Sequence, residues 1–226
     1  MPAATTTPDQ QRRRLRVGLV GAGRHAREVI APALTLAGIE IAGVAARGTS
    51  SAANLAELLG NVPAFAGAPA MIASLRGEID AIVAVLPAGQ GEVAISPALE
   101  AGLAVYCEKP GALAADELRK LELARAERQG KVMIGYMKRF APAYRRARDL
   151  ACEADFGGIS ALSLQWSMGS LYADADYFLR ENAVHMFDLI RFLIGEVTEV
   201  HAIRDRSGAG IAIAQALRLV VSVNVV

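Results

Sequence analysis

The stretch that decides the fold is LRVGLVGAGRHA, residues 15–26. Its apolar first half predicts a buried strand, and the glycines after it open a helix. Gly21 allows a tight turn, Gly23 lets the backbone approach a pyrophosphate, and the small Ala26 permits close packing of helix on strand. We therefore predict a dinucleotide-binding loop, with a purely structural turn as the alternative. The residues expected to contact the dinucleotide here are Gly21, Ala22, Gly23, Arg24 and His25, although a loop histidine is often incidental.

Outward from this loop, short apolar runs alternate with helix-length amphipathic segments, the pattern of parallel strands joined by crossover helices. We expect a helix over Leu113–Gln129, with Leu118, Leu121 and Ala124 on its apolar stripe and Gly130 at its end. The predicted fold class is α/β, a doubly wound parallel sheet of the Rossmann type, covered on both faces. Its expected strands are Leu15–Val20, Ile39–Ala45, Ala81–Leu86, Leu103–Cys107 and Lys131–Gly135.

The pattern changes after about Met137, where a second, α+β domain with an open sheet is expected. Its predicted elements are a strand over Ile159–Ser167, a helix over Asn182–Ile194, and strands over Val197–Ile203 and Ile211–Val225. We expect three parts in all: a disordered tail over residues 1–14, a Rossmann domain over 15–136, and a shortened substrate and oligomerisation domain over 137–226.

Composition narrows the function. The chain has 226 residues, 53% of them apolar, and a net charge of +1, which gives no electrostatic argument for nucleic acid or an anionic membrane. The arginine run at 12–16 is expected to be a solvated extension, with nucleic-acid binding as the alternative. Two cysteines allow neither a disulfide framework nor a cysteine-rich metal site, so we expect no metal. No signal-like or membrane-spanning run occurs, and we expect a cytoplasmic protein with a small-molecule substrate.

The end of the second expected strand bears on the choice of cofactor. An acidic residue there would hold the ribose 2′-hydroxyl of NAD, but this chain has Ala46 followed by Arg47. A guanidinium can pair with the 2′-phosphate of NADP. We therefore expect NADP, with NAD possible, and the alternative is that Arg47 is an ordinary surface arginine.

A second motif, Val105–Pro110, carries Glu-Lys-Pro at the carboxyl edge of the sheet, where ligands of such folds bind. The chain contains 20 arginines and four lysines, so a retained lysine is informative. Lysine is a compact donor that can join a proton relay. Lys109 is therefore a candidate catalytic and substrate-binding residue.

A third group of polar residues opens the helix expected in the second domain. His185 lies three residues before Asp188 and four after Glu181, so all three can share one helix face or its N-terminal approach. A carboxylate beside an imidazole orients the ring and favours its protonated form, which suits a proton-donating catalyst. We assign all three as candidate catalytic residues, with a structural histidine as the alternative.

Taken together, these motifs resemble the glucose–fructose oxidoreductase, inositol dehydrogenase and rhizopine-catabolism group, Gfo/Idh/MocA. The resemblance rests on the glycine loop, on AGLAVYCEKP at 101–110, on GYMKRFAP at 135–142 and on the His185-x-x-Asp188 pattern. It implies that Lys109 holds the substrate oxygen near the nicotinamide, that His185 is the general acid–base, that the active site lies between the two domains, and that the sheet of the second domain makes homo-oligomers. Further expected cofactor contacts are Leu86, Pro87, Glu108 and Lys109, and further expected substrate contacts are Arg139, Trp166, Tyr172 and Asp176.

Three departures from the family pattern qualify these expectations. Glu181 stands where many relatives have aspartate, the loop at 86–91 lacks the usual Thr and His, and the chain is shorter than the family usually is. We expect either that another chain completes the sheet or that this is a shortened or diverged variant. The predicted substrate is a sugar, a free or nucleotide-linked keto-sugar, or a cyclitol. The alternative is a dinucleotide-binding subunit without catalysis, serving in sensing or assembly.

Overall fold

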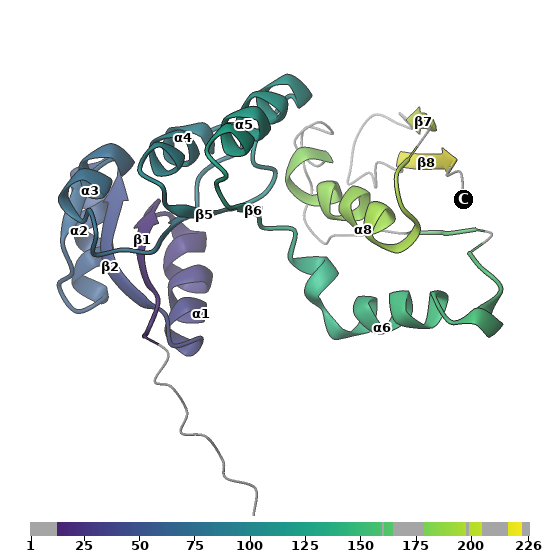
Figure 1. Ribbon diagram of the computed structural model, residues 1–226, viewed down its shortest axis with the longest axis horizontal. Coiled ribbons are helices and arrows are strands. Elements are labelled where there is room, and N and C mark those ends of the chain that lie inside the picture. The colour runs from purple at the N-terminus through teal and green to yellow at the C-terminus, as the bar shows by residue number, and fades with distance from the viewer. Residues whose placement is uncertain (1–12, 160, 165–178, 198, 205–216, 223–226) are drawn as a thin grey trace, which may run out of the picture. The chain divides into compact units, whose positions relative to one another are not determined.

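The computed structural model describes residues 13–159, 161–164, 179–197, 199–204 and 217–222, and Figure 1 shows their elements. The chain forms two compact units, Met1–Ile134 and Gly135–Val226. This division lies close to the boundary that the sequence predicts after Tyr136.

A six-stranded parallel sheet forms the centre of the first unit, in the order β3-β2-β1-β4-β5-β6. This is the strand order of two mononucleotide-binding halves, which reverses direction beside β1. The predicted Rossmann fold is therefore confirmed. The strands are β1 (Arg16–Val20), β2 (Glu40–Ala46), β3 (Ala64–Ala66), β4 (Ala81–Ala84), β5 (Ala104–Cys107) and β6 (Val132–Ile134).

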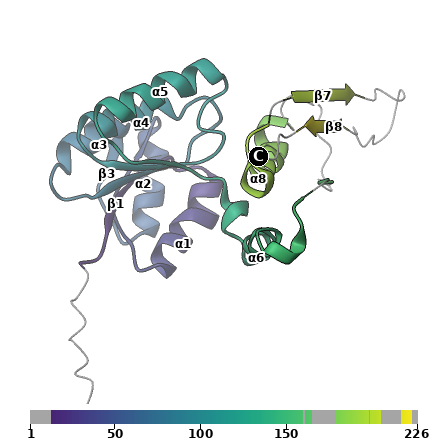
Figure 2. The ribbon, with the colours of Figure 1, turned by 45° about the vertical axis from the view of Figure 1, so that its right-hand side comes forward.

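Helices cover both faces of this sheet, as Figure 2 shows. One face packs on α3 (Ala68–Ser74), α4 (Glu92–Glu100) and α5 (Ala115–Glu127), and its core includes the fully buried Met71 and Ile95. The other face packs on the helical turn η1 (Ala26–Ile30), α1 (Ala31–Leu36) and α2 (Thr49–Leu58), around Leu19 and Val44. Apolar strand residues are buried on both sides, which explains their near-continuous apolar runs.

Helix α5 begins and ends close to the predicted residues. The Glu117 carboxylate accepts the backbone N–H groups of Leu113 and Ala114, which satisfies donors left open at the helix start. Past the other end, an added Cβ on Gly130 would lie 2.3 Å from Leu99 Cδ2, so a side chain here would require the Leu99 side chain to shift. The predicted apolar stripe is partly wrong, because Leu118 is 39% exposed while Leu121 and Ala124 pack on the core.

The second unit contains helices around α8 (Val184–Ile194) and a two-stranded antiparallel sheet. A π-helical turn, η4 (Leu179–Ala183), precedes α8, so the helix starts later than predicted. The 3₁₀ turn η2 (Met137–Phe140) and α6 (Pro142–Ala151) both pack against α8. Among the described residues, this unit also contains the 3₁₀ turn η3 (Ala154–Phe156) and the strands β7 (Glu199–Arg204) and β8 (Leu217–Ser222).

The strand predicted over Ile159–Ser167 is wrong where the structure describes it. Residues 159 and 161–164 are not in a strand, and residues 161–163 are exposed. The rest of that segment lies outside the described residues, as does most of the tail predicted over residues 1–14. Arg13 is described, and its guanidinium pairs with Asp80.

Candidate active site

The glycine loop leaves β1 between the ends of its two neighbouring strands. The Gly21 N–H donates to the Ala45 carbonyl of β2 at 2.8 Å, and the Val85 N–H, just past β4, donates to the Val20 carbonyl at 2.7 Å. The helical turn η1 then starts at once, with Ala26 fully buried against the sheet. The loop therefore has the strand–turn–helix setting that a dinucleotide-binding loop needs.

The two glycines of this loop have different structural roles. Gly21 has a φ of +107°, and an added Cβ would lie 2.1 Å from the Val85 carbonyl oxygen, so backbone packing requires a glycine here. Gly23 is exposed, and an added Cβ would meet nothing within 4 Å. Internal packing therefore does not require Gly23. Open space beside the first N–H groups of the following helix fits the pyrophosphate of a dinucleotide.

The loop after β4 closes against the segment that follows the Glu-Lys-Pro turn. An added Cβ on Gly91 would lie 2.5 Å from the Gly111 carbonyl oxygen, and one on Gly89 would lie 2.7 Å from the Leu113 side chain. Leu86 is partly buried on the core, whereas Pro87 is exposed. The loop that lacks the family's usual Thr and His thus packs on the lysine-bearing segment through its glycines.

The Glu-Lys-Pro turn starts where β5 ends. The Glu108 N–H continues the ladder by donating to the Ala84 carbonyl at 2.8 Å. The Lys109–Pro110 peptide bond is cis, and Lys109 is partly buried. Cys107, the last residue of the strand, is almost fully buried, and this burial raises the pKa of its thiol to about 11. The turn therefore follows a buried, neutral thiol, and Lys109 lies at the carboxyl edge of the sheet.

Two side chains converge on one oxygen of Glu108. The Tyr106 hydroxyl donates to Glu108 Oε1 at 2.7 Å, and His25 Nε2 lies 3.7 Å from the same oxygen. The Glu108 side chain is only 12% exposed. Burial, and then the hydrogen bond to Glu108, raise the pKa of Tyr106 above its ordinary value, so the hydroxyl stays protonated and donates. This contact brings the glycine loop and the Glu-Lys-Pro turn together in the first unit.

The end of β2 has the arrangement that the sequence predicts for the adenosine side of the cofactor. Ala46 is partly buried, Arg47 is exposed, and α2 begins two residues later at Thr49. No carboxylate follows at residues 48–53 to repel a 2′-phosphate. A guanidinium beside a helix N-terminus is suited to an anionic group.

In the second unit, His185 is buried in the first turn of α8. Its ring meets that of Tyr136 edge-on, with 6.5 Å between the centroids. Burial, and then the Asp188 charge, raise the pKa of Tyr136, so its hydroxyl stays neutral. Glu181 is partly buried and lies in the π-helical turn before α8, so it approaches the histidine from the helix N-terminus.

The buried Asp188 forms a two-pronged ion pair that the sequence did not reveal. Arg139 Nε donates to Asp188 Oδ2 at 3.0 Å, and Arg139 Nη2 donates to Asp188 Oδ1. The same guanidinium lies over the Phe192 ring, with 5.6 Å from Cζ to the centroid. Asp188, expected to orient the imidazole, and Arg139, expected to contact substrate, thus bind each other and tie η2 to α8. The other predicted substrate contacts, Trp166, Tyr172 and Asp176, lie outside the described residues.

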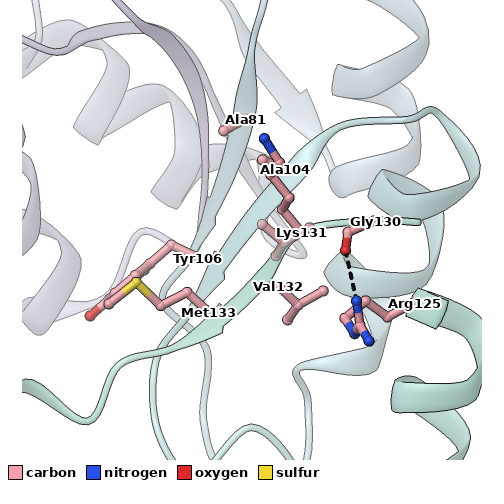
Figure 3. Close-up of a pocket in the computed structure, with 9 residues that line it drawn as sticks. Ala81, Ala104, Tyr106, Arg125, Gly130, Lys131, Val132 and Met133 are labelled. Atoms are coloured by element: carbon pink, nitrogen blue, oxygen red, sulfur yellow. Dashed lines mark hydrogen bonds between the residues drawn. The ribbon is translucent and has the colours of Figure 1, made fainter. Parts of the chain in front are cut away.

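A shallow cavity of about 520 Å³ lies elsewhere on the first unit, along β5 and β6. Figure 3 shows Arg125 donating to the Gly130 carbonyl at its rim. Its lining includes Ala81, Ala104 and Val132, the first residues of three strands, so it extends to the edge opposite the Glu-Lys-Pro turn.

Within the described residues, no group of three acidic, histidine or cysteine side chains is arranged to hold a metal ion. The same part of the chain has no helix long and apolar enough to span a membrane.

Comparison with known proteins matches residues 15–136 to the sequence profile of an oxidoreductase family with an NAD-binding Rossmann fold, Gfo/Idh/MocA. This chain belongs to that family. It is 31% identical to the rhizopine catabolism protein MocA of Rhizobium meliloti over 81% of its own length and 58% of the relative's. It is 32% identical to an inositol 2-dehydrogenase of Corynebacterium glutamicum strain R, over 80% of its own length and 54% of the relative's.

A solved structure agrees with this membership. The oxidoreductase from Thermotoga maritima is 27% identical, with a TM-score of 0.71 over 87% of this chain and 64% of that one. The chain spans a little over half the length of each of the two sequence relatives named above. The resemblance expected from the motifs is confirmed, and so is the NAD(P)-binding class of the first unit.

Proposed function

We propose that this member of the Gfo/Idh/MocA family is an NAD(P)-dependent dehydrogenase or reductase that acts on a CH–OH group of a cyclitol or sugar. The observation that carries the proposal is the approach of His25 to Glu108, 3.7 Å apart, because it brings the glycine loop beside the Glu-Lys-Pro turn. A pyrophosphate held by the first and a substrate held by the second would be neighbours at the carboxyl edge of the sheet.

The residues of the glycine loop suit the cofactor. Open space at Gly23 and the N–H groups of η1 would hold the pyrophosphate, and the Glu108 and Lys109 turn would lie toward the nicotinamide end. When bound, the nicotinamide supplies or accepts the hydride. The protein's part is to position the reacting carbon and to exclude side reactions.

Lys109 and His185 are proposed for two different tasks. The Lys109 ammonium donates a hydrogen bond to the substrate oxygen and stabilises negative charge that develops on it. His185 takes the proton from that oxygen during oxidation and returns it during reduction. Glu181 is proposed to orient the imidazole from the N-terminal side of α8. Arg139 is proposed as a positioning residue that holds Asp188, in place of the substrate contact that the sequence suggested.

We further propose a preference for NADP. The supporting observations are the exposed Arg47 directly after β2, Ala46 in place of a carboxylate, and the N-terminus of α2 two residues on. The name of the inositol 2-dehydrogenase relative favours a cyclitol such as inositol over other polyols as the first substrate to test.

The test is a titration of the purified 226-residue chain with NADPH and with NADH, followed by absorbance assays with inositols, sugars and keto-sugars. We expect binding of both cofactors, tighter for NADPH, and turnover with at least one substrate class. Tight binding with no turnover across the panel would favour a non-catalytic dinucleotide-binding subunit. Failure to bind either cofactor would contradict the proposal.

A further inference from the structure

Three side chains in the first unit meet above the end of one strand. Strand β4 lies between β1 and β5 in the sheet, so His25, which follows β1, and Glu108, which follows β5, can meet only across the carboxyl end of β4. Tyr106 reaches the same Glu108 oxygen from within β5, two residues earlier and therefore on the same face of the strand. One carboxylate thus connects two loops that the sheet keeps two strands apart.

The three side chains differ in how far they are exposed to solvent. Glu108 is 12% exposed, whereas His25 is 53% exposed. The Tyr106 ring packs on the core cluster beneath η1 and α1, and its hydroxyl donates to Glu108. Tyr106 therefore fixes the carboxylate from the protein interior, while the imidazole lies on the solvent side, where a cofactor would enter.

We propose that His25, Glu108 and Tyr106 form a latch that couples occupation of the glycine loop to the position of Lys109. In this assignment His25 is a positioning residue and does not touch the substrate. The imidazole beside the carboxylate separates the cofactor's phosphates from the Glu108 charge, which would otherwise repel them. Cofactor binding then holds the imidazole beside Glu108, and Glu108 fixes the turn that carries Lys109. The proposal rests on the dinucleotide site of the proposed function and adds the coupling.

Other groups face the histidine or lie near it. On its own helical turn, Arg24 approaches Glu28 at 4.0 Å, and the Arg27 guanidinium lies 3.1 Å from Glu28. These contacts turn both arginines toward Glu28. Among these neighbouring contacts, His25 is the side chain whose nitrogen the structure places beside Glu108.

The direct test is hydrogen–deuterium exchange of the whole chain with and without NADPH, because this readout does not depend on turnover. In the wild type we expect NADPH to slow exchange both in the glycine loop and at the amides of residues 108–113. In His25→Gln, the glycine loop should still be protected at saturating NADPH. Protection at 108–113 should fall by about fivefold, the lower end of ordinary coupling between sites.

Three further variants separate the latch from a simple contact with phosphate. Tyr106→Phe removes the hydroxyl with the ring retained and should reproduce the loss at 108–113. His25→Lys restores a cation and should recover part of it. Arg27→Gln, a nearby exposed arginine that faces Glu28, should change both regions by less than about twofold. Thermal unfolding of each variant shows that the fold is intact.

The outcomes distinguish the two proposals. Unchanged protection at 108–113 in His25→Gln, with the glycine loop still protected, would overturn the latch and leave the dinucleotide site standing. Protection by NADPH in neither region of the wild type would overturn the proposed function and, with it, the coupling. A loss of NADPH affinity in His25→Gln with wild-type protection of 108–113 at saturation would show a phosphate contact only and would also overturn the latch.

Discussion

The two units hold their candidate site residues by different means. In the first, the backbone does most of the work: Gly21 packs on a carbonyl, Gly91 packs on the next loop, and Glu108 continues a strand ladder before the turn with Lys109. In the second, the candidate histidine lies on α8, and the ion pair between Arg139 and the buried Asp188 ties this helix to η2. A Cβ added at a tightly packed glycine should therefore lower the stability of the first unit, and the loss of an ion-pair side chain should lower the stability of the second.

The largest effect is expected at Lys109 and His185, the two residues proposed to act in catalysis. Lys109→Ala and His185→Ala should each lower turnover by about 10²–10⁴-fold, the usual contribution of a positioned acid–base group, because each removes a group proposed to act on the substrate oxygen. Cofactor affinity should stay nearly unchanged. Steady-state kinetics with NADPH titrations check this, and the double variant should lose little more than either single one. Full activity in either single variant would refute that residue's role.

The backbone of the first unit can be broken at Gly21. Gly21→Ala places a Cβ 2.1 Å from the Val85 carbonyl oxygen at a φ of +107°, so we expect a loss of about 3 kcal/mol in the free energy of unfolding. Gly38→Ala is the matched control, because Gly38 also has a positive φ, +72°, but open space around it. It should cost about 1 kcal/mol. Equal losses in urea unfolding would show that the close approach to Val85 does not matter.

The side-chain pair of the second unit provides the converse test. Arg139→Ala leaves the buried Asp188 without its guanidinium and should destabilise the chain by about 2 kcal/mol, since one partner of a mostly buried pair is lost. Arg139→Lys should recover only part, because an ammonium cannot bind both oxygens in parallel. Arg191→Ala removes an exposed pair with Glu196 and should cost at most about 0.5 kcal/mol. Similar losses of unfolding free energy for Arg139→Ala and Arg191→Ala in chemical denaturation would contradict the proposed positioning role of Arg139.

The same contrast explains how much the sequence could predict. The strands and α5 follow from local periodicity, and the glycine loop and Glu-Lys-Pro turn follow from motifs whose backbone demands are local. The latch on Glu108 and the Arg139–Asp188 pair join residues that are 83 and 49 positions apart, and no local pattern encodes such distances. The three-residue β3 was missed because Ala64–Ala66 is too short to show a period. The strand predicted over Ile159–Ser167 is wrong at residues 159 and 161–164, where the apolar run misled because two of its residues, Ala161 and Leu162, are exposed.

A smaller effect is expected at the adenosine end of the first unit. Arg47→Ala should weaken NADPH by about tenfold, as expected for the loss of a charge-assisted pair with phosphate, and should leave NADH nearly unchanged. Fluorescence titrations with the two cofactors measure the ratio. An equal effect on both would mean that Arg47 is an ordinary surface residue.

The smallest effect is expected in the pH dependence of the free energy of unfolding, where the two cysteines, one in each unit, can be compared. The pKa of the buried Cys107 is raised from 9.0 to about 11, so the folded state favours the neutral thiol. The resulting contribution to the free energy of unfolding is fully present below pH 9 and is lost as the pH rises toward 11. The loss is about 1 kcal/mol by pH 10. Cys107→Ala should flatten the fall of unfolding free energy over this range. Cys152→Ala, at an exposed thiol, is the control and should not. An unchanged slope in Cys107→Ala would contradict the assignment.

The central claim is that the open space at Gly23 belongs to a dinucleotide. The most direct measurement is calorimetric titration of Gly23→Ala with NADPH beside the wild type, with unfolding measured on the same samples. An added Cβ meets nothing in the protein, so the free energy of unfolding should change by less than about 0.5 kcal/mol. NADPH affinity should fall at least about tenfold, because the methyl group would occupy the path of the pyrophosphate. Wild-type affinity in this variant would contradict the account.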